Sequence, residues 1–150
     1  MLPFFVLLVA FAVFRGAGWT GIVSLDGWQP ALRAALAVMF LFTATAHWGR
    51  GRADLVRMVP PRLPRPDLVV TATGVLEILG AIGLVIPATS RLAAASLAVL
   101  LVALFPANVY AARRGLTILG RKATNLPVRT ALQVVFILAL IAAGQDRSRK

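Results

Sequence analysis

The sequence predicts an all-α fold, a transmembrane helical bundle. Hydrophobic residues make up 59% of the 150-residue chain, and the mean hydropathy is +0.85. Charged residues contribute only 14%, whereas soluble domains carry about 25%. The apolar residues gather in five segments, which lie at approximately 2–24, 30–48, 68–88, 91–112 and 127–144. A chain of this length has room for one domain of four or five spanning helices.

The first segment differs from the other four. Its apolar run Leu2–Phe14 is too short to cross the ~30 Å hydrocarbon core unless the helix continues through Arg15 and the glycines after it. We predict a span, with a tilted or interfacial helix as the alternative. Residues 1–28 hold this first segment, residues 29–145 hold the other four apolar segments, and residues 146–150 form a polar, basic tail.

Ends of the later segments carry local helix signals. Pro30 and Pro127 suit first helical turns, because proline lacks a donor that this position leaves unused. Ser90 suits the N-cap of the fourth segment. The short connection between the third and fourth segments predicts an antiparallel hairpin of helices. Pro106 should bend the fourth helix and free the carbonyl of Val102.

The basic residues predict the orientation. Sixteen Lys and Arg face five Asp and Glu, and most of them lie in the two long connections, residues 49–66 and 113–126. Both connections fall on one side of the membrane, which the positive-inside bias identifies as the cytoplasm. The excess charge therefore fits a lipid bilayer with anionic headgroups as the partner. Nucleic acid is not expected, since no basic face with stacking aromatics lies outside the apolar segments.

Glu77 is the only charged residue in the apolar run 68–88. Asp67 marks the start of this run, so a helical rise of ~1.5 Å per residue puts Glu77 ~15 Å deep, near the middle of the membrane. A carboxylate at this depth is costly unless it is neutral, hydrated or paired with a cation. The candidate cations are Arg129, His47 and Arg15. We predict a functional site at Glu77, with a structural hydrogen bond between helices as the alternative.

Other polar residues of the apolar segments lie near the same predicted surface. His47 ends the second segment, Asn108 lies about one turn before the end of the fourth, and Arg129 and Gln133 share a face at the start of the fifth. We therefore predict a polar cavity that opens toward the cytoplasm, with Glu77 at its floor. Its predicted ligand-binding residues are Glu77, Asn108, Gln133, Arg129, His47, Thr43, which shares a face with His47, and Thr73, one turn before Glu77.

Residue types limit the chemistry of such a site. The chain has no cysteine, which excludes disulfides, thiol redox chemistry and iron–sulfur ligation by its own residues. One histidine and one membrane carboxylate do not make a metal or haem site, so we predict no metal and no cofactor within the chain. Gly74 and Gly80 flank Glu77 and should allow a neighbouring helix to come close.

Several motifs resemble the DoxX family of small prokaryotic membrane proteins. The similar stretches are HWGRGRADLVRMVPPRLPRP, TGVLEILGAIGLVIPATSRLAA, FPANVYAA and PVRTALQ, which together cover about Leu36–Ala143. The family pattern falls on His47, Val59–Pro64, Gly74 with Glu77 and Gly80, Phe105–Asn108, and Arg129 with Gln133. Thr45 and Ala46 stand where the family often has glycine. The resemblance implies a four-helix bundle in a prokaryotic plasma membrane, to which this chain adds a helix.

Three functions follow as hypotheses. The resemblance implies a link to membrane redox processes, through quinone or a membrane or peripheral redox partner. We therefore expect an accessory or ligand-binding subunit that holds a quinone or lipid around Glu77. The second hypothesis is a membrane enzyme with Glu77 and His47 as an acid–base pair. The third is a proton-linked transporter with Glu77 as the carrier, although only Pro106 interrupts a helix.

Overall fold

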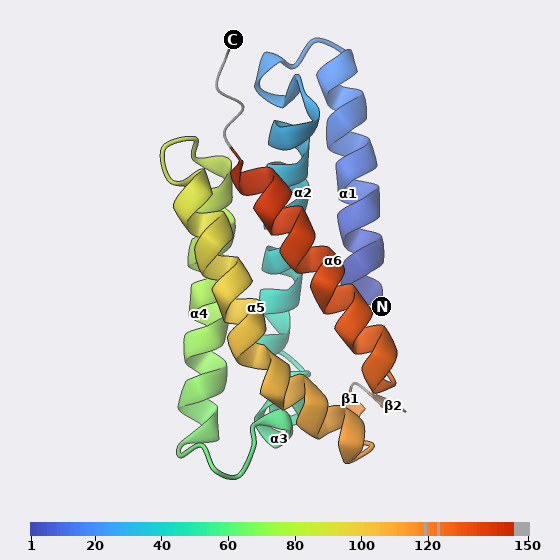
Figure 1. Ribbon diagram of the computed structural model, residues 1–150, viewed down its shortest axis with the longest axis vertical. Coiled ribbons are helices and arrows are strands. Elements are labelled where there is room, and N and C mark those ends of the chain that lie inside the picture. Colours follow the sequence, from blue (N-terminus) through green and yellow to red (C-terminus); the bar gives the residue numbers. More distant parts are fainter. Residues whose placement is uncertain (119, 123, 146–150) are drawn as a thin grey trace.

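The computed structural model describes residues 1–118, 120–122 and 124–145. Figure 1 shows how their helices and strands are arranged. The elements are α1 (Leu2–Trp19), the 3₁₀ turn η1 (Val23–Leu25), α2 (Trp28–Ala44), the 3₁₀ turn η2 (Thr45–His47), α3 (Arg52–Met58), α4 (Pro66–Val85), α5 (Ser90–Arg113), β1 (Thr117–Ile118), β2 (Arg121–Lys122) and α6 (Leu126–Gly144).

Five of these helices are long and apolar enough to cross a membrane: α1, α2 with its extension η2, α4, α5 and α6. This confirms the predicted helical bundle and the five apolar segments. α1 forms a continuous helix through Arg15, as the prediction of a first span requires. Proline occupies the first turn of α1, α4 and α6, where its missing donor costs no hydrogen bond.

Two features of the long connections were not predicted. The proline-rich connection after η2 contains the short helix α3, and the connection after α5 forms a two-stranded antiparallel hairpin, in which Thr117 pairs with Lys122. The N-cap prediction for α5 was wrong. Thr89 is the N-cap residue, and the Ser90 hydroxyl donates instead to the carbonyl oxygen of Pro87 at 3.0 Å.

α2 is the central helix of the bundle. It packs against α1, α4 and α6, while α5 packs between α4 and α6. Both basic connections lie at one end of the bundle (Figure 1), as the charge pattern predicted. The opposite end carries the α1–α2 and α4–α5 connections and the end of α6.

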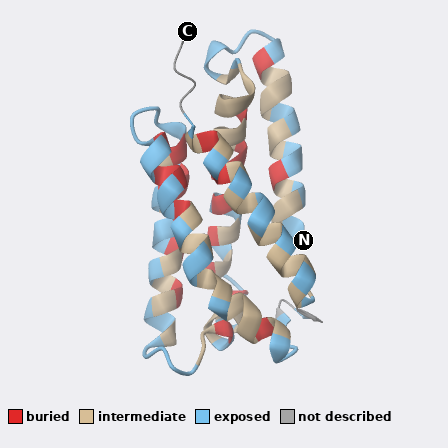
Figure 2. Ribbon diagram, in the orientation of Figure 1, coloured by how far each residue is buried: buried red, intermediate tan, exposed pale blue. Residues whose placement is uncertain are grey.

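The buried residues lie along the inner faces of the helices, and exposed residues cover the outside (Figure 2). Among the described residues, six large apolar side chains are fully buried: Leu36, Met39, Phe40, Leu84, Leu97 and Leu140. Large apolar side chains also cover the outside, among them Leu79, Val99 and Leu138, each more than half exposed. Continuous apolar exposure over the outer faces is typical of a helical bundle whose solvent is lipid.

Candidate functional site

Glu77 lies in the interface between α2 and α4. It is only 6% exposed and belongs to the inward face of α4, with its neighbours at three- and four-residue spacing. The residues of this face are Val70, Gly74, Glu77, Gly80, Ala81 and Leu84. Glu77 therefore points into the protein, and the acyl chains of the membrane do not surround it.

The partner of Glu77 is Thr43 on α2. The distance from Thr43 Oγ1 to Glu77 Oε2 is 2.8 Å, and the same hydroxyl oxygen lies 2.9 Å from the carbonyl oxygen of Phe40. A hydroxyl has one proton, so it can donate to only one of these two oxygens. Both contacts are hydrogen bonds if the carboxyl is protonated and donates to Thr43, which then donates to Phe40. The geometry therefore fits a neutral Glu77.

His47 lies about one turn from this pair, on the side of the basic connections. Its imidazole packs directly on the backbone of α4 at Gly74, where a Cβ atom would lie 2.7 Å from His47 Cγ and 2.8 Å from the ring of Trp48. Only glycine allows this approach. His47 is 6% exposed, and its Nδ1 is buried without a hydrogen bond of regular geometry. The sequence correctly grouped His47 with Thr43 on one face.

Four predicted partners of Glu77 do not pair with it, and His47, which lies on Gly74 instead, is one of them. The Thr73 hydroxyl donates to the carbonyl oxygen of Val70 within its own helix, at 3.0 Å. Arg15 stacks on Trp19 within α1, with its guanidinium carbon 5.1 Å from the ring centre. Arg129 binds Asn108. Among the described residues, the structure records no ion pair to Glu77.

The α5–α6 interface holds the remaining predicted residues. Arg129 Nη1 donates to Asn108 Oδ1 at 2.7 Å, and Arg129 Nε donates to the carbonyl oxygen of Thr124 at 3.1 Å. Gln133 Nε2 donates to the carbonyl oxygen of Leu101 at 2.9 Å. Pro106 lies inside α5, as expected. The acceptor of Gln133, the carbonyl oxygen of Leu101, lies in the turn of α5 before this proline.

The predicted residues therefore form two groups rather than one funnel. Thr43, His47 and Glu77 lie between α2 and α4, whereas Asn108, Arg129 and Gln133 lie between α5 and α6. Since α4 packs against α2 and α5, and α6 packs against α5 and α2, the two groups belong to different seams of the bundle.

The α2–α4 group is closed by neighbouring side chains. His47 and Trp48 cover Gly74, and Leu97 covers Gly80, where a Cβ atom would lie 2.5 Å from its side chain. Two hollows elsewhere measure about 480 and about 230 Å³. The larger is an apolar groove of α1 and α2, and the smaller lies between α5 and α6 near Arg91, and the predicted site residues line neither. A ligand would reach Glu77 only after these covering side chains move.

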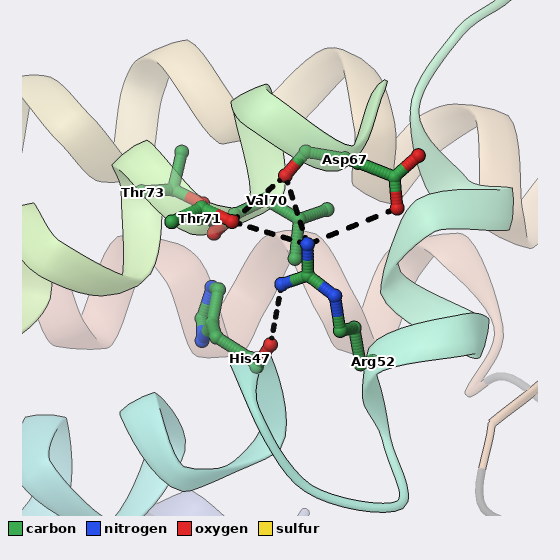
Figure 3. A network of polar contacts seen from close by, with 6 residues as sticks. All are labelled: His47, Arg52, Asp67, Val70, Thr71 and Thr73. Carbon is green, nitrogen blue, oxygen red and sulfur yellow. Dashed lines mark hydrogen bonds and ion pairs between the residues drawn. The ribbon is translucent and has the colours of Figure 1, made fainter. Parts of the chain in front are cut away.

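Sequence reasoning missed the polar network beside His47 (Figure 3). Its centre is Arg52, whose guanidinium contacts the carbonyl oxygen of His47, the first turn of α4 at Asp67, and the hydroxyl of Thr71. The only sequence signal is an arginine five residues after the histidine, in a connection whose arginines indicate membrane orientation. Within the described residues, no group of three His, Cys, Asp or Glu is arranged to hold a metal ion.

Comparison with known proteins identifies the family. Residues 36–143 match the family described as "Domain of unknown function (DUF8561)". The match covers more than half of the chain. The chain belongs to this family. The matched region begins within α2 and ends within α6, so it contains both polar groups, whereas α1 lies before it. Neither the curated proteins nor the solved structures contain a significant match to the chain.

Proposed function

We propose that this member of the DUF8561 family is an accessory or ligand-binding membrane subunit, which holds the polar head of a small hydrophobic molecule at Thr43, His47 and Glu77. Quinones and lipids are the ligand class. The observation that carries the proposal is a carboxyl group inside an apolar helix, turned inward, with a hydroxyl as its partner rather than a cation.

The cost of this carboxyl supports a function. An ionisable group within a spanning helix costs several kcal/mol, and an apolar side chain of similar volume would pack α2 against α4 at no such cost. One hydrogen bond between transmembrane helices contributes only about 0.6 kcal/mol on average. The bond between Thr43 and Glu77 therefore does not by itself offset the presence of the acid.

The chemistry of the three side chains suits an oxygen-bearing head group. A protonated Glu77 that donates to Thr43 leaves its second oxygen as an acceptor, and the imidazole of His47 offers a donor and an acceptor. A quinone carbonyl accepts hydrogen bonds, and a quinol or lipid hydroxyl both donates and accepts them. The apolar tail would lie among the exposed apolar side chains that surround the bundle.

The membrane, the family resemblance and the orientation belong to the same proposal. We place the protein in a prokaryotic plasma membrane, with residues 49–66 and 113–126 in the cytoplasm, on the basis of their arginines and the positive-inside bias. The DoxX-like motifs support a four-helix core within residues 29–145 and a membrane or peripheral redox partner. Because the chain has no cysteine, its own part in redox chemistry would be quinone binding or partner anchoring.

Native mass spectrometry tests the proposal. The wild-type protein, purified in a mild detergent, is expected to carry a co-purified quinone or lipid that Glu77→Gln loses. Thr43→Val should reduce the bound fraction, whereas the matched control Thr73→Val should not, because the Thr73 hydroxyl bonds only its own helix. Identical adducts in the wild-type protein and Glu77→Gln, with equal thermal stability, would contradict the proposal and favour a structural Glu77.

A second candidate is a membrane enzyme that uses His47 and Glu77 as an acid–base pair on a lipid-soluble substrate. The supporting observation is that Gly74 allows the imidazole to lie on α4 one turn from the carboxyl. Conversion of a quinol or lipid in proteoliposomes that both His47→Gln and Glu77→Gln abolish would favour this function. Unchanged substrate in the wild-type protein would leave ligand binding as the better account.

A third candidate is proton-linked transport. The observation that favours it is that the one hydroxyl proton of Thr43 lies near two oxygens, which fits a protonated Glu77. A neutral carboxyl within a spanning segment is a proton carrier if it is reached from both sides. A pH-sensitive dye inside proteoliposomes should then report proton movement that Glu77→Gln abolishes. Equal proton flux with and without Glu77 would exclude this function.

A further inference from the structure

Arg52, the first residue of α3, joins the end of α2 to the beginning of α4 (Figure 3). Its Nη1 donates to the carbonyl oxygen of His47 at 2.8 Å. Its Nη2 donates to the hydroxyl of Thr71 at 3.1 Å and to the carbonyl oxygen of Asp67 at 3.2 Å, and it lies 3.8 Å from the Asp67 carboxylate. One guanidinium therefore joins His47, five residues before Arg52, to Asp67 and Thr71, which lie 15 and 19 residues after it.

This connection lies over the end of the α2–α4 interface. Next along the inward face of α4 come Val70, which is 4% exposed, then Gly74 under the His47 ring, then Glu77 with its Thr43 partner. The path from the basic end of the bundle to Glu77 is thus closed by His47. The backbone of His47 is held in place by Arg52.

The segment that Arg52 holds begins at a strained residue. Arg65 has a φ of +53°, the one positive value at a non-glycine position among the described residues. It precedes Pro66, and the residue before a proline favours extended conformations. Movement of the first turn of α4 would relieve this strain. The Arg52–Asp67 ion pair opposes such movement only weakly, because the Asp67 side chain is 71% exposed to solvent.

We propose that Arg52 is a positioning residue that acts as a latch, and that it controls access from the aqueous phase at the basic end to the Thr43–Glu77 pair. Release of its hydrogen bonds to His47 and Thr71 lets η2 and the first turn of α4 separate, which exposes the α2–α4 interface. Water, protons and the polar head of the ligand enter by this route. The inference rests on the proposed function for its purpose, but the opening itself is measured without any ligand.

Cysteine labelling tests the latch directly, since the chain contains no cysteine. The reporter is Val70→Cys, a buried position between the latch and Gly74. The control reporter is Ala35→Cys, a fully buried position of α2 further toward the other end. Each is treated in proteoliposomes with a charged, membrane-impermeant methanethiosulfonate. We expect Arg52→Gln to raise the labelling rate of Val70→Cys at least about tenfold, because several charge-assisted hydrogen bonds are lost together.

Two further variants keep the test interpretable. Arg52→Lys retains the charge but loses the planar fork, so it should give an intermediate rate, and it replaces Arg52→Gln if that variant does not fold. Arg62→Gln removes an exposed arginine of the same connection and should change nothing. An unchanged rate at Val70→Cys in both Arg52 variants would overturn the latch. A parallel rise at Ala35→Cys would also overturn it, because general loosening of the bundle would then be the cause.

Failure of the latch can be distinguished from failure of the proposed function. If Glu77→Gln keeps its adduct while Arg52→Gln still opens the interface, the latch stands and ligand binding at Glu77 does not. If Glu77→Gln loses the adduct while the labelling rate of Val70→Cys is the same with and without Arg52, ligand binding stands and the ligand enters by another route.

Discussion

The α2–α4 and α5–α6 interfaces both carry polar side chains within apolar helices, but they satisfy them differently. Between α5 and α6, each strong donor has an acceptor on the neighbouring element: Arg129 with Asn108, and Gln133 with the carbonyl of Leu101. Between α2 and α4, the carboxyl of Glu77 has only the hydroxyl of Thr43 as its recorded partner, and Nδ1 of His47 has no regular hydrogen bond. A satisfied network stabilises a fold, whereas an under-satisfied one is where function is expected.

The largest effect on stability is expected at the satisfied interface. Arg129→Met removes the bonds to Asn108 and to the Thr124 carbonyl and should lower the free energy of unfolding by about 3 kcal/mol, the upper end of the range for a hydrogen bond to a charged group, because two such bonds are lost. Thermal unfolding in detergent measures this loss. The double variant Asn108→Leu/Arg129→Met should recover part of it, because no unpaired amide remains. If the single variant is as stable as the wild type, the network is not structural.

A smaller loss is expected at the glycine beneath His47. Gly74→Ala places a methyl group 2.7–2.8 Å from His47 and Trp48 and should destabilise the protein by about 1–3 kcal/mol, as overpacking does. The matched control is Gly16→Ala in α1, where no atom lies within 4 Å of the new Cβ. This control should be neutral or slightly stabilising, because alanine favours a helix more than glycine does. Equal effects of the two substitutions would mean that the His47–Gly74 contact is loose.

Removal of the Thr43 hydroxyl should cost about 1 kcal/mol, because its contacts with Glu77 and with the carbonyl oxygen of Phe40 are lost together. Infrared spectroscopy of Thr43→Val adds a sharper readout. The carbonyl stretch of a protonated carboxyl should be present in the wild type, shift in Thr43→Val and vanish in Glu77→Gln, since the geometry at Thr43 fits a neutral acid. A wild-type spectrum without this band would show that Glu77 is ionised.

The smallest effect is expected for Gln133→Leu. One interhelical hydrogen bond is lost, and transmembrane examples average about 0.6 kcal/mol. The apolar leucine leaves only the Leu101 carbonyl without its donor, so the melting temperature should fall only slightly. A loss as large as that of Arg129→Met would mean that Gln133 supports α5 near Pro106 more strongly than one hydrogen bond does.

The sequence contained the depth of each polar residue but not its direction around the helix bundle. Depth follows from counting residues along a helix, so the five spans, the common end of the basic connections and the level of Glu77 could be predicted. Which seam a residue faces depends on how whole helices pack. Glu77 and Arg129 were therefore expected together, although they lie in different seams.

Local competition accounts for the other errors. Thr73 was expected to bond Glu77, but threonine hydroxyls readily bond the carbonyl three or four residues earlier, and here that acceptor is Val70. The Arg52 network, α3 and the hairpin lie in basic, proline-rich connections, where hydrophobic periodicity gives no signal. The sequence placed Thr43 and Glu77 in one predicted site but did not identify Thr43 as the hydrogen-bond partner of Glu77.

We propose that the under-satisfied α2–α4 interface binds a molecule and that the satisfied α5–α6 interface does not. The most direct measurement is the amount of small hydrophobic molecule retained per protein after identical purification of Glu77→Gln and of Asn108→Leu/Arg129→Met. We expect the first variant to lose the molecule while it remains folded, and the second to keep it despite lower stability. Retention by Glu77→Gln, or equal loss from both variants, would contradict the claim.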